Sequence, residues 1–76
     1  EMIENVILIE SLIQFGNRYR ASNRSVDEKL LEAEEAFLQY RYVKALEEAA
    51  SAVEMIDPAA IHRIEQLVQE QLTVKS

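Results

Sequence analysis

The fold class follows from one stretch of the sequence, SVDEKLLEAEEAFLQY, which occupies residues 25–40. Ser25 and Glu28 have the spacing of a capping box, which starts an α-helix. Apolar residues then recur at alternating intervals of four and three, the spacing of one helix face. The residues of this face are Val26, Leu30, Ala33, Phe37 and Tyr40, with Leu31 and Leu38 beside them. The stretch therefore predicts an amphipathic helix over residues 26–39, packed through its apolar side.

Three further helices are predicted around this one, over residues 3–21, 42–56 and 58–72. A tight turn around Tyr40-Arg41-Tyr42 separates the second helix from the third, because one straight helix through both would exceed the usual length. Asp57 can cap the fourth helix, and Pro58 suits its first turn while ending the third. With one Gly and one Pro in 76 residues, the sequence predicts an all-α fold. We expect a small antiparallel bundle of about four helices, forming a single domain over residues 1–76.

Composition narrows the kinds of partner. The net charge is −6 and the isoelectric point is about 4.7, whereas nucleic-acid and anionic membrane surfaces attract clustered cations. The longest aliphatic run, Val6–Ile9, falls far short of the ~20 residues that span a bilayer. Cysteine is absent, which removes thiolate metal sites. We therefore expect a protein partner, with no nucleic acid and no membrane contact by this segment.

Residues suited to catalysis or metal binding are sparse. His62 and Glu65 form half of a helical di-iron motif, but a complete site needs a second such pair and two more carboxylates. The adjacent acids Glu34-Glu35 and Glu47-Glu48 diverge by about 100° on a helix and do not converge on one substrate. No Gly-rich phosphate loop is present. We expect neither enzymatic activity nor a cofactor.

The candidate protein-binding site is a polar and basic segment near the end of the first helix. Its polar groups interrupt an otherwise apolar helix and are not required by core packing. Its residues are Gln14, Phe15, Gly16, Asn17, Arg18, Tyr19 and Arg20. Aromatic and Arg residues of this kind are common in recognition patches. A solvated helix face, or packing against another part of a longer protein, would explain the same segment.

The same segment resembles the C-terminal end of the EzrA family, the septation ring formation regulators of low-GC Gram-positive bacteria. The likeness is carried by Leu12-Ile13-Gln14-Phe15-Gly16-Asn17-Arg18-Tyr19-Arg20. It continues through Leu31-x-Ala33-Glu34-x-x-Phe37, Tyr42-x-x-Ala45-Leu46-Glu47 and Ala52-Val53-Glu54, and closes with Pro58. It covers nearly the whole chain, and the first string is its most specific part.

The resemblance implies a regulator with one N-terminal transmembrane helix and a long cytoplasmic region of spectrin-like repeats. Such proteins act at the division septum, interact with the tubulin-like protein FtsZ and with other division or cell-wall proteins, and restrain extra ring assembly. A family patch rich in Gln, Asn and Arg serves midcell placement and maps onto Gln14–Arg20. The chain would then be the C-terminal fragment of a longer protein, on the cytoplasmic side of the membrane.

Two alternatives to a docking module remain from the sequence. One is a structural rod end or homodimer, in which the first helix pairs with a second copy through Leu8 and Leu12. The other is a tetratricopeptide-like domain, because the spacing from Glu32 to Pro58 follows that rhythm. In that case the Tyr40 and Tyr42 region would hold a linear peptide.

Overall fold

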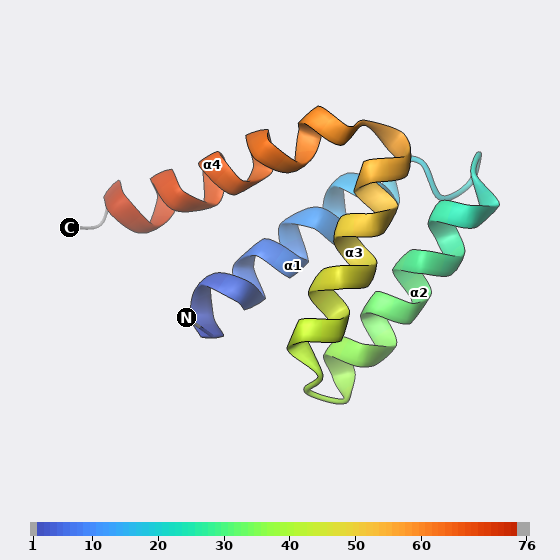
Figure 1. Cartoon of the computed structure of the whole chain (residues 1–76), viewed down its shortest axis with the longest axis horizontal. Coiled ribbons are helices and arrows are strands. Elements are labelled where there is room, and N and C mark those ends of the chain that lie inside the picture. The colour runs from blue at the N-terminus through green and yellow to red at the C-terminus, as the bar shows by residue number, and fades with distance from the viewer. Residues whose placement is uncertain (1, 75–76) are drawn as a thin grey trace.

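The computed structural model describes the backbone of residues 2–74 and the side chains of residues 5–70. The described chain is four α-helices without a β-strand (Figure 1). The helices are α1 (Met2–Asn17), α2 (Arg24–Leu38), α3 (Tyr42–Ile56) and α4 (Pro58–Val74). The predicted all-α bundle of four helices is therefore confirmed.

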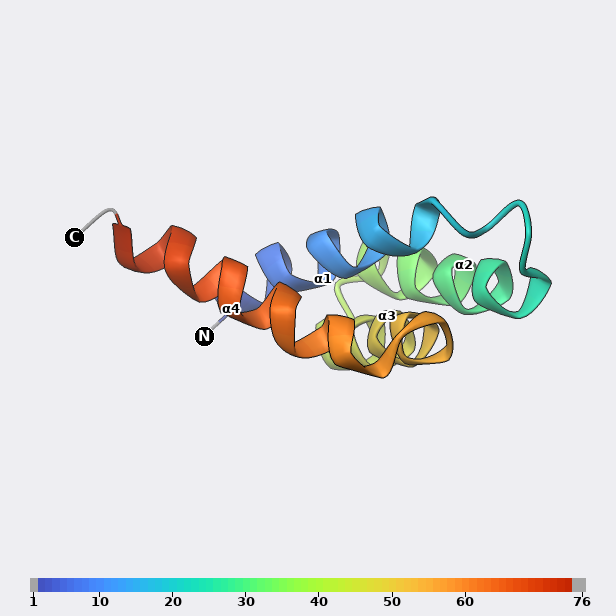
Figure 2. The same ribbon diagram turned by 90° about the horizontal axis from the view of Figure 1, so that it is seen from above.

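The helices form a flat bundle with extents of 40 × 27 × 15 Å. Helices α1, α2 and α3 run alternately up and down, and α2 and α3 form the most extensive contact of the bundle (Figure 1). After the turn at Asp57, α4 leaves the end of α3 and runs back beside α1 (Figures 1 and 2). Over the part of the chain described here, α2 and α4 make no contact. The two outer helices thus present separate surfaces.

Small residues let the helices approach closely. Six buried residues of the core are alanines: Ala33, Ala36, Ala45, Ala49, Ala52 and Ala60. The largest fully buried side chains come from α1, α2 and α3: Ile9, Leu12, Val26, Leu30 and Val53. Alanine loses no side-chain rotamer freedom in a helix, so it combines close packing with high helix propensity. The core is therefore thin, with a few large buried side chains packed among alanines of the neighbouring helices.

The connection between α1 and α2 differs from the expected one. Helix α1 ends at Asn17, four residues before the expected end, and residues 18–22 form turns. Helix α2 begins at Arg24, and its N-cap is Asn23 rather than Ser25. The Asn23 side-chain oxygen accepts the backbone N–H of Val26 at 3.2 Å. Asn caps a helix as well as Ser does, so the earlier start replaces the expected capping box and adds helical backbone bonds.

The turn between α2 and α3 places a tyrosine in a conformation that favours glycine. Tyr40 has φ of 64°, in the left-handed region. The backbone N–H of Arg41 donates to the carbonyl of Ala36 at 2.8 Å, and the Tyr40 N–H donates to the carbonyl of Phe37 at 3.0 Å. This bond pair is a Schellman motif, which ends α2 sharply.

The expected apolar face of α2 is wider than the buried one. Val26, Leu30 and Ala33 are fully buried, but Phe37 is only half-buried. Tyr40, expected on the packed stripe, is 78% exposed, and Leu31 and Leu38, expected beside that stripe, are 53% and 77% exposed. The short side chains of α3 leave room for only a narrow stripe of α2. The left-handed turn also carries Tyr40 out of the helical register.

Candidate protein-binding site

The seven candidate residues do not share one helix face. Gln14–Asn17 form the last turn of α1, while Arg18, Tyr19 and Arg20 lie in the turn that follows. The Tyr19 backbone N–H donates to the carbonyl of Gly16 at 2.9 Å, which begins this turn. Burial divides the segment in a second way. Gln14 and Arg18 are exposed and form its outer part, whereas Gly16 and Arg20 are buried or half-buried and form its inner part.

The outer part consists of Gln14 and Arg18. Both side chains are exposed, and among the described residues neither makes a hydrogen bond or an ion pair. They lie four residues apart, Gln14 in the last turn of α1 and Arg18 at the start of the turn that follows. These two groups can form hydrogen bonds to another molecule without first breaking a bond to any of the described residues.

A groove between α1 and α4 lies directly beside these two groups. Its volume is about 240 Å³. It is lined by Ser11, Gln14, Phe15, Arg18, Ile64, Leu67 and Val68. Leu67 is 58% exposed on the wall from α4, and the Phe15 ring on the wall from α1 packs against Tyr19 with their ring centroids 5.6 Å apart. The arrangement is an apolar groove with a polar and cationic rim, which suits an apolar side chain flanked by acceptor groups.

Gly16 belongs to the inner part and has a packing role. It is buried, and a Cβ added there would lie 2.8 Å from Cδ1 of Leu30. Because Leu30 is fully buried on α2, it has little room to move away. Gly16 therefore allows the close approach of α1 and α2 and is not available to a partner.

Arg20 is the second residue of the inner part, and its side chain is held by three others. Its Nε–H donates to Oδ1 of Asp27 at 2.8 Å, and its Nη1 donates to Oε2 of Glu34 at 3.0 Å. Nη1 also donates to Oδ1 of Asn17 at 3.0 Å. The bonds to Glu34 and then to Asp27 raise the pKa of Arg20 above its ordinary value. Arg20 thus fastens the α1–α2 turn to α2, and Asn17, although exposed, supports it.

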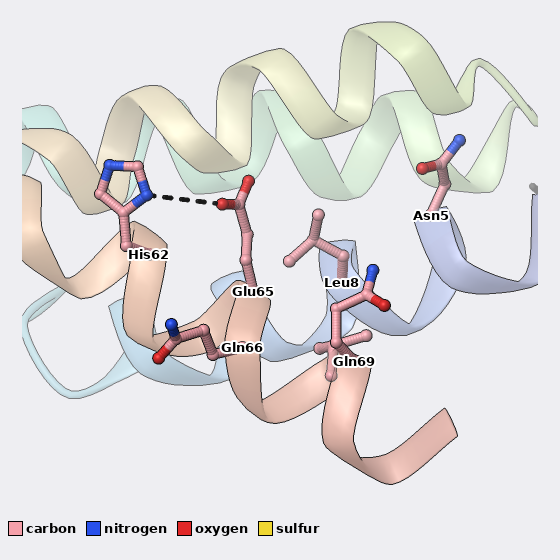
Figure 3. Close-up of a pocket in the computed structure, with 7 residues that line it drawn as sticks. Asn5, Leu8, His62, Glu65, Gln66 and Gln69 are labelled. Carbon is pink, nitrogen blue, oxygen red and sulfur yellow. Dashed lines mark ion pairs between the residues drawn. The ribbon is translucent and has the colours of Figure 1, made fainter. Parts of the chain in front are cut away.

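A second groove between the same helices is lined partly by polar residues of α4 (Figure 3). Its volume is about 370 Å³. His62 and Glu65 lie side by side there, with Nδ1 and Oε1 3.7 Å apart; Leu8 of α1 lies next to Glu65, and Asn5 of α1 lies at the far end from His62 (Figure 3). His62 is largely exposed. Over the described side chains, no three His, Cys, Asp or Glu residues converge as metal ligands.

Comparison with known proteins assigns the chain to a family. A sequence model of the family described as "Septation ring formation regulator, EzrA" matches residues 1–68. The chain belongs to the EzrA family. It is 48% identical to the septation ring formation regulator EzrA of Geobacillus sp. strain WCH70 over 71 residues, which are 93% of this chain and 12% of that protein. The EzrA proteins of Bacillus subtilis strain 168 and Listeria welshimeri are 48% and 40% identical over 84% and 97% of this chain, respectively, and over 11% and 13% of their own lengths.

The matched region is a small share of these relatives. The chain spans about an eighth of the length of the EzrA proteins it matches. No solved structure matches it. None of the helices in the described residues has the length and apolar character needed to cross a bilayer.

The sequence missed one wall of the groove. Leu67 is an apolar residue of α4, yet it is exposed beside the candidate segment. Periodicity assigns an apolar residue to a helix face, but it does not say which other helix that face meets. The α1–α4 pairing, and with it the groove, becomes visible only in three dimensions.

Proposed function

We propose that this chain is a non-catalytic protein-binding module of a septation regulator, which docks a division protein in the α1–α4 groove. Gln14 and Arg18 form the polar rim of the site, and Phe15 and Leu67 form its apolar walls. Through this contact the EzrA protein is placed at midcell, on the cytoplasmic side of the membrane, and restrains assembly of the FtsZ ring. FtsZ is the first partner to test, and other division or cell-wall proteins are the next.

The observation that carries this proposal is the exposure of Gln14 and Arg18 beside an apolar groove. Exposed apolar surface rimmed by polar groups is typical of protein-interaction sites, and Arg is enriched among residues that dominate binding energy. Membership of the EzrA family directs the proposal to septation. The proposal narrows the seven candidate residues: Gly16 and Arg20 support the site from inside, Asn17 supports Arg20, and Tyr19 backs Phe15.

The homodimer through the first helix has less support than docking. Leu12 is 1% exposed and Leu8 is half-buried against the core. A dimer through these residues would require α1 to leave its own bundle. The spectrin-like and tetratricopeptide-like descriptions stay predictions.

The direct test is binding of purified FtsZ to this chain with and without the rim. We expect the variant Gln14→Ala/Arg18→Ala to bind FtsZ at least about tenfold more weakly, because a hot-spot residue contributes about 2 kcal/mol or more. Gln39→Ala/Arg41→Ala is the matched control, since it removes one exposed amide and one exposed guanidinium at the α2–α3 turn. Equal binding by the two variants would refute the proposed site for FtsZ. The same pair of variants then tests other division proteins.

A further inference from the structure

A second exposed surface lies on the outer side of α2, away from α4. Leu31 and Leu38 are 53% and 77% exposed there. Together with Glu32, Glu34 and Glu35 they line a shallow depression of about 390 Å³. Two large exposed leucines on one helix serve neither the core nor the groove between α1 and α4. We call the surface formed by Leu31, Glu32, Glu35 and Leu38 the α2 face.

The charge around these leucines is mainly negative. The segment from Leu31 to Leu38 contains three Glu residues and no Lys or Arg. Glu34 is occupied by Arg20 of the α1–α2 turn, whereas Glu35 is exposed and has no ion pair within the described chain. The nearest cation of α2, Lys29, is turned toward Glu48 of α3 at 3.2 Å. The α2 face therefore offers apolar contacts beside Glu35, whose charge has no ion pair within the described chain, and beside Glu32, whose carboxyl group lies near Glu48 of α3.

The geometry and the charge select one kind of occupant. Leu31 and Leu38 are seven residues apart, or about 10 Å along the helix axis. Apolar residues at the same seven-residue interval on a second helix can pack against both leucines. Cationic residues flanking that second apolar stripe would meet Glu32 and Glu35. A second copy of this chain would instead place like charges against each other, because a symmetric contact uses the same patch twice.

We propose that the α2 face is a docking site for a cationic amphipathic helix of another protein. The leucines supply the apolar contact, and the carboxylates select a basic partner and speed its approach. This site is separate from the proposed FtsZ-binding groove, so the two proposals can fail independently.

The test is titration of the chain with a defined probe. The probe is a fluorescein-labelled helical peptide of about 18 residues, built only of Leu and Lys with Leu on one face. A peptide of the same composition in scrambled order, and one with Glu in place of Lys, are the peptide controls. We expect saturable binding of the amphipathic cationic peptide alone, measured by anisotropy. In NMR spectra of the chain, we also expect the amide shifts caused by this peptide to be confined to α2.

Two variants separate the apolar and electrostatic contributions. Leu31→Ser/Leu38→Ser should weaken binding at least about tenfold, since each leucine loses its buried contact. Glu32→Gln/Glu35→Gln should weaken binding several-fold in low salt and flatten its salt dependence. The matched control Met55→Ser/Glu47→Gln/Glu54→Gln changes one exposed apolar and two exposed acidic residues of α3. It should change the affinity less than about twofold.

Several results would overturn the proposal. If the α3 control weakens peptide binding as much as the α2 variants do, binding depends only on the overall acidity of the chain. A scrambled peptide that binds as tightly as the amphipathic one would lead to the same conclusion. Amide shifts centred on α1 and α4 would place the peptide in the other groove. If the chain instead dimerises in light scattering and Leu31→Ser/Leu38→Ser abolishes the dimer, the occupant is a second copy. Because both leucines are exposed, their variant should keep the wild-type circular dichroism, and the amide shifts of the wild-type chain test the site without any variant.

Discussion

The two arginines that flank Tyr19 are two residues apart and have opposite surroundings. Arg20 is held by Asp27 and Glu34 and has 21% of its side chain exposed. Arg18 is exposed and makes no ion pair within the described chain. The same division separates buried Gly16 from exposed Gln14. The short segment thus contains one arginine that holds the turn to α2 and another that is exposed and open to the proposed contact, and composition alone does not distinguish them.

The largest effect on folding is expected at Gly16. Gly16→Val should lower the free energy of unfolding by about 2–3 kcal/mol, because its side chain would force buried Leu30 out of place. Urea denaturation measures the loss. In the double variant Gly16→Val/Leu30→Ala the clash is removed, so the two changes should destabilise by less than the sum of the single effects. Strict additivity would show that Gly16 and Leu30 do not compete for space.

A smaller loss is expected at Arg20. Arg20→Met should lower the free energy of unfolding by about 1 kcal/mol, because it removes charged hydrogen bonds that are partly screened by water. Arg18→Met is the matched control and should stay within about 0.5 kcal/mol of the wild type, since Arg18 makes no hydrogen bond or ion pair within the described chain. Thermal melting of the two variants in one buffer makes the comparison. Equal melting temperatures would remove the distinction between the two arginines.

Low pH should weaken the ion pair that joins α2 to α3. Glu48 accepts from Lys29 at 3.2 Å and lies 3.6 Å from Lys44; the hydrogen bond from Lys29 is the main cause that lowers the pKa of Glu48 below its ordinary value. A lowered folded-state pKa contributes stability above the unfolded-state pKa, and this contribution is lost as the pH falls through the folded-state pKa. Between about pH 5 and pH 3, the melting temperature of Glu48→Gln should therefore fall by less than that of the wild type. Parallel pH curves for both proteins would contradict this assignment.

The smallest effect on stability is expected at the outer part. Gln14→Ala/Arg18→Ala should leave the free energy of unfolding within about 0.5 kcal/mol of the wild type, because both side chains are exposed and unbonded within the described chain. Urea denaturation alongside Gly16→Val measures it. A loss comparable with that of Gly16→Val would mean that the rim is part of the fold.

The sequence predicted the helical class because its apolar spacing, its Asp57-Pro58 junction and its lack of sheet-forming segments agree with one another. It did not predict which polar residues point inward. From the sequence, Arg20 was expected in the exposed binding segment. In the structure, the turn after Asn17 places its side chain against Asp27 and Glu34, which lie seven and fourteen residues further along the chain. The exposure of Leu31 and Leu38 was missed for a related reason, since the small residues of α3 narrow the buried stripe of α2. Local periodicity fixes a helix, but packing against other helices decides the fate of each side chain.

The most direct test is the midcell fraction of a fluorescently tagged full-length EzrA protein that carries Gln14→Ala/Arg18→Ala in this segment. We expect the variant to accumulate at the wild-type level, to fold normally and to lose its concentration at the septum. The single variant Arg18→Met should lose part of the septal concentration. Undiminished septal fluorescence in the double variant would contradict the claim that the exposed rim of α1 is the contact surface.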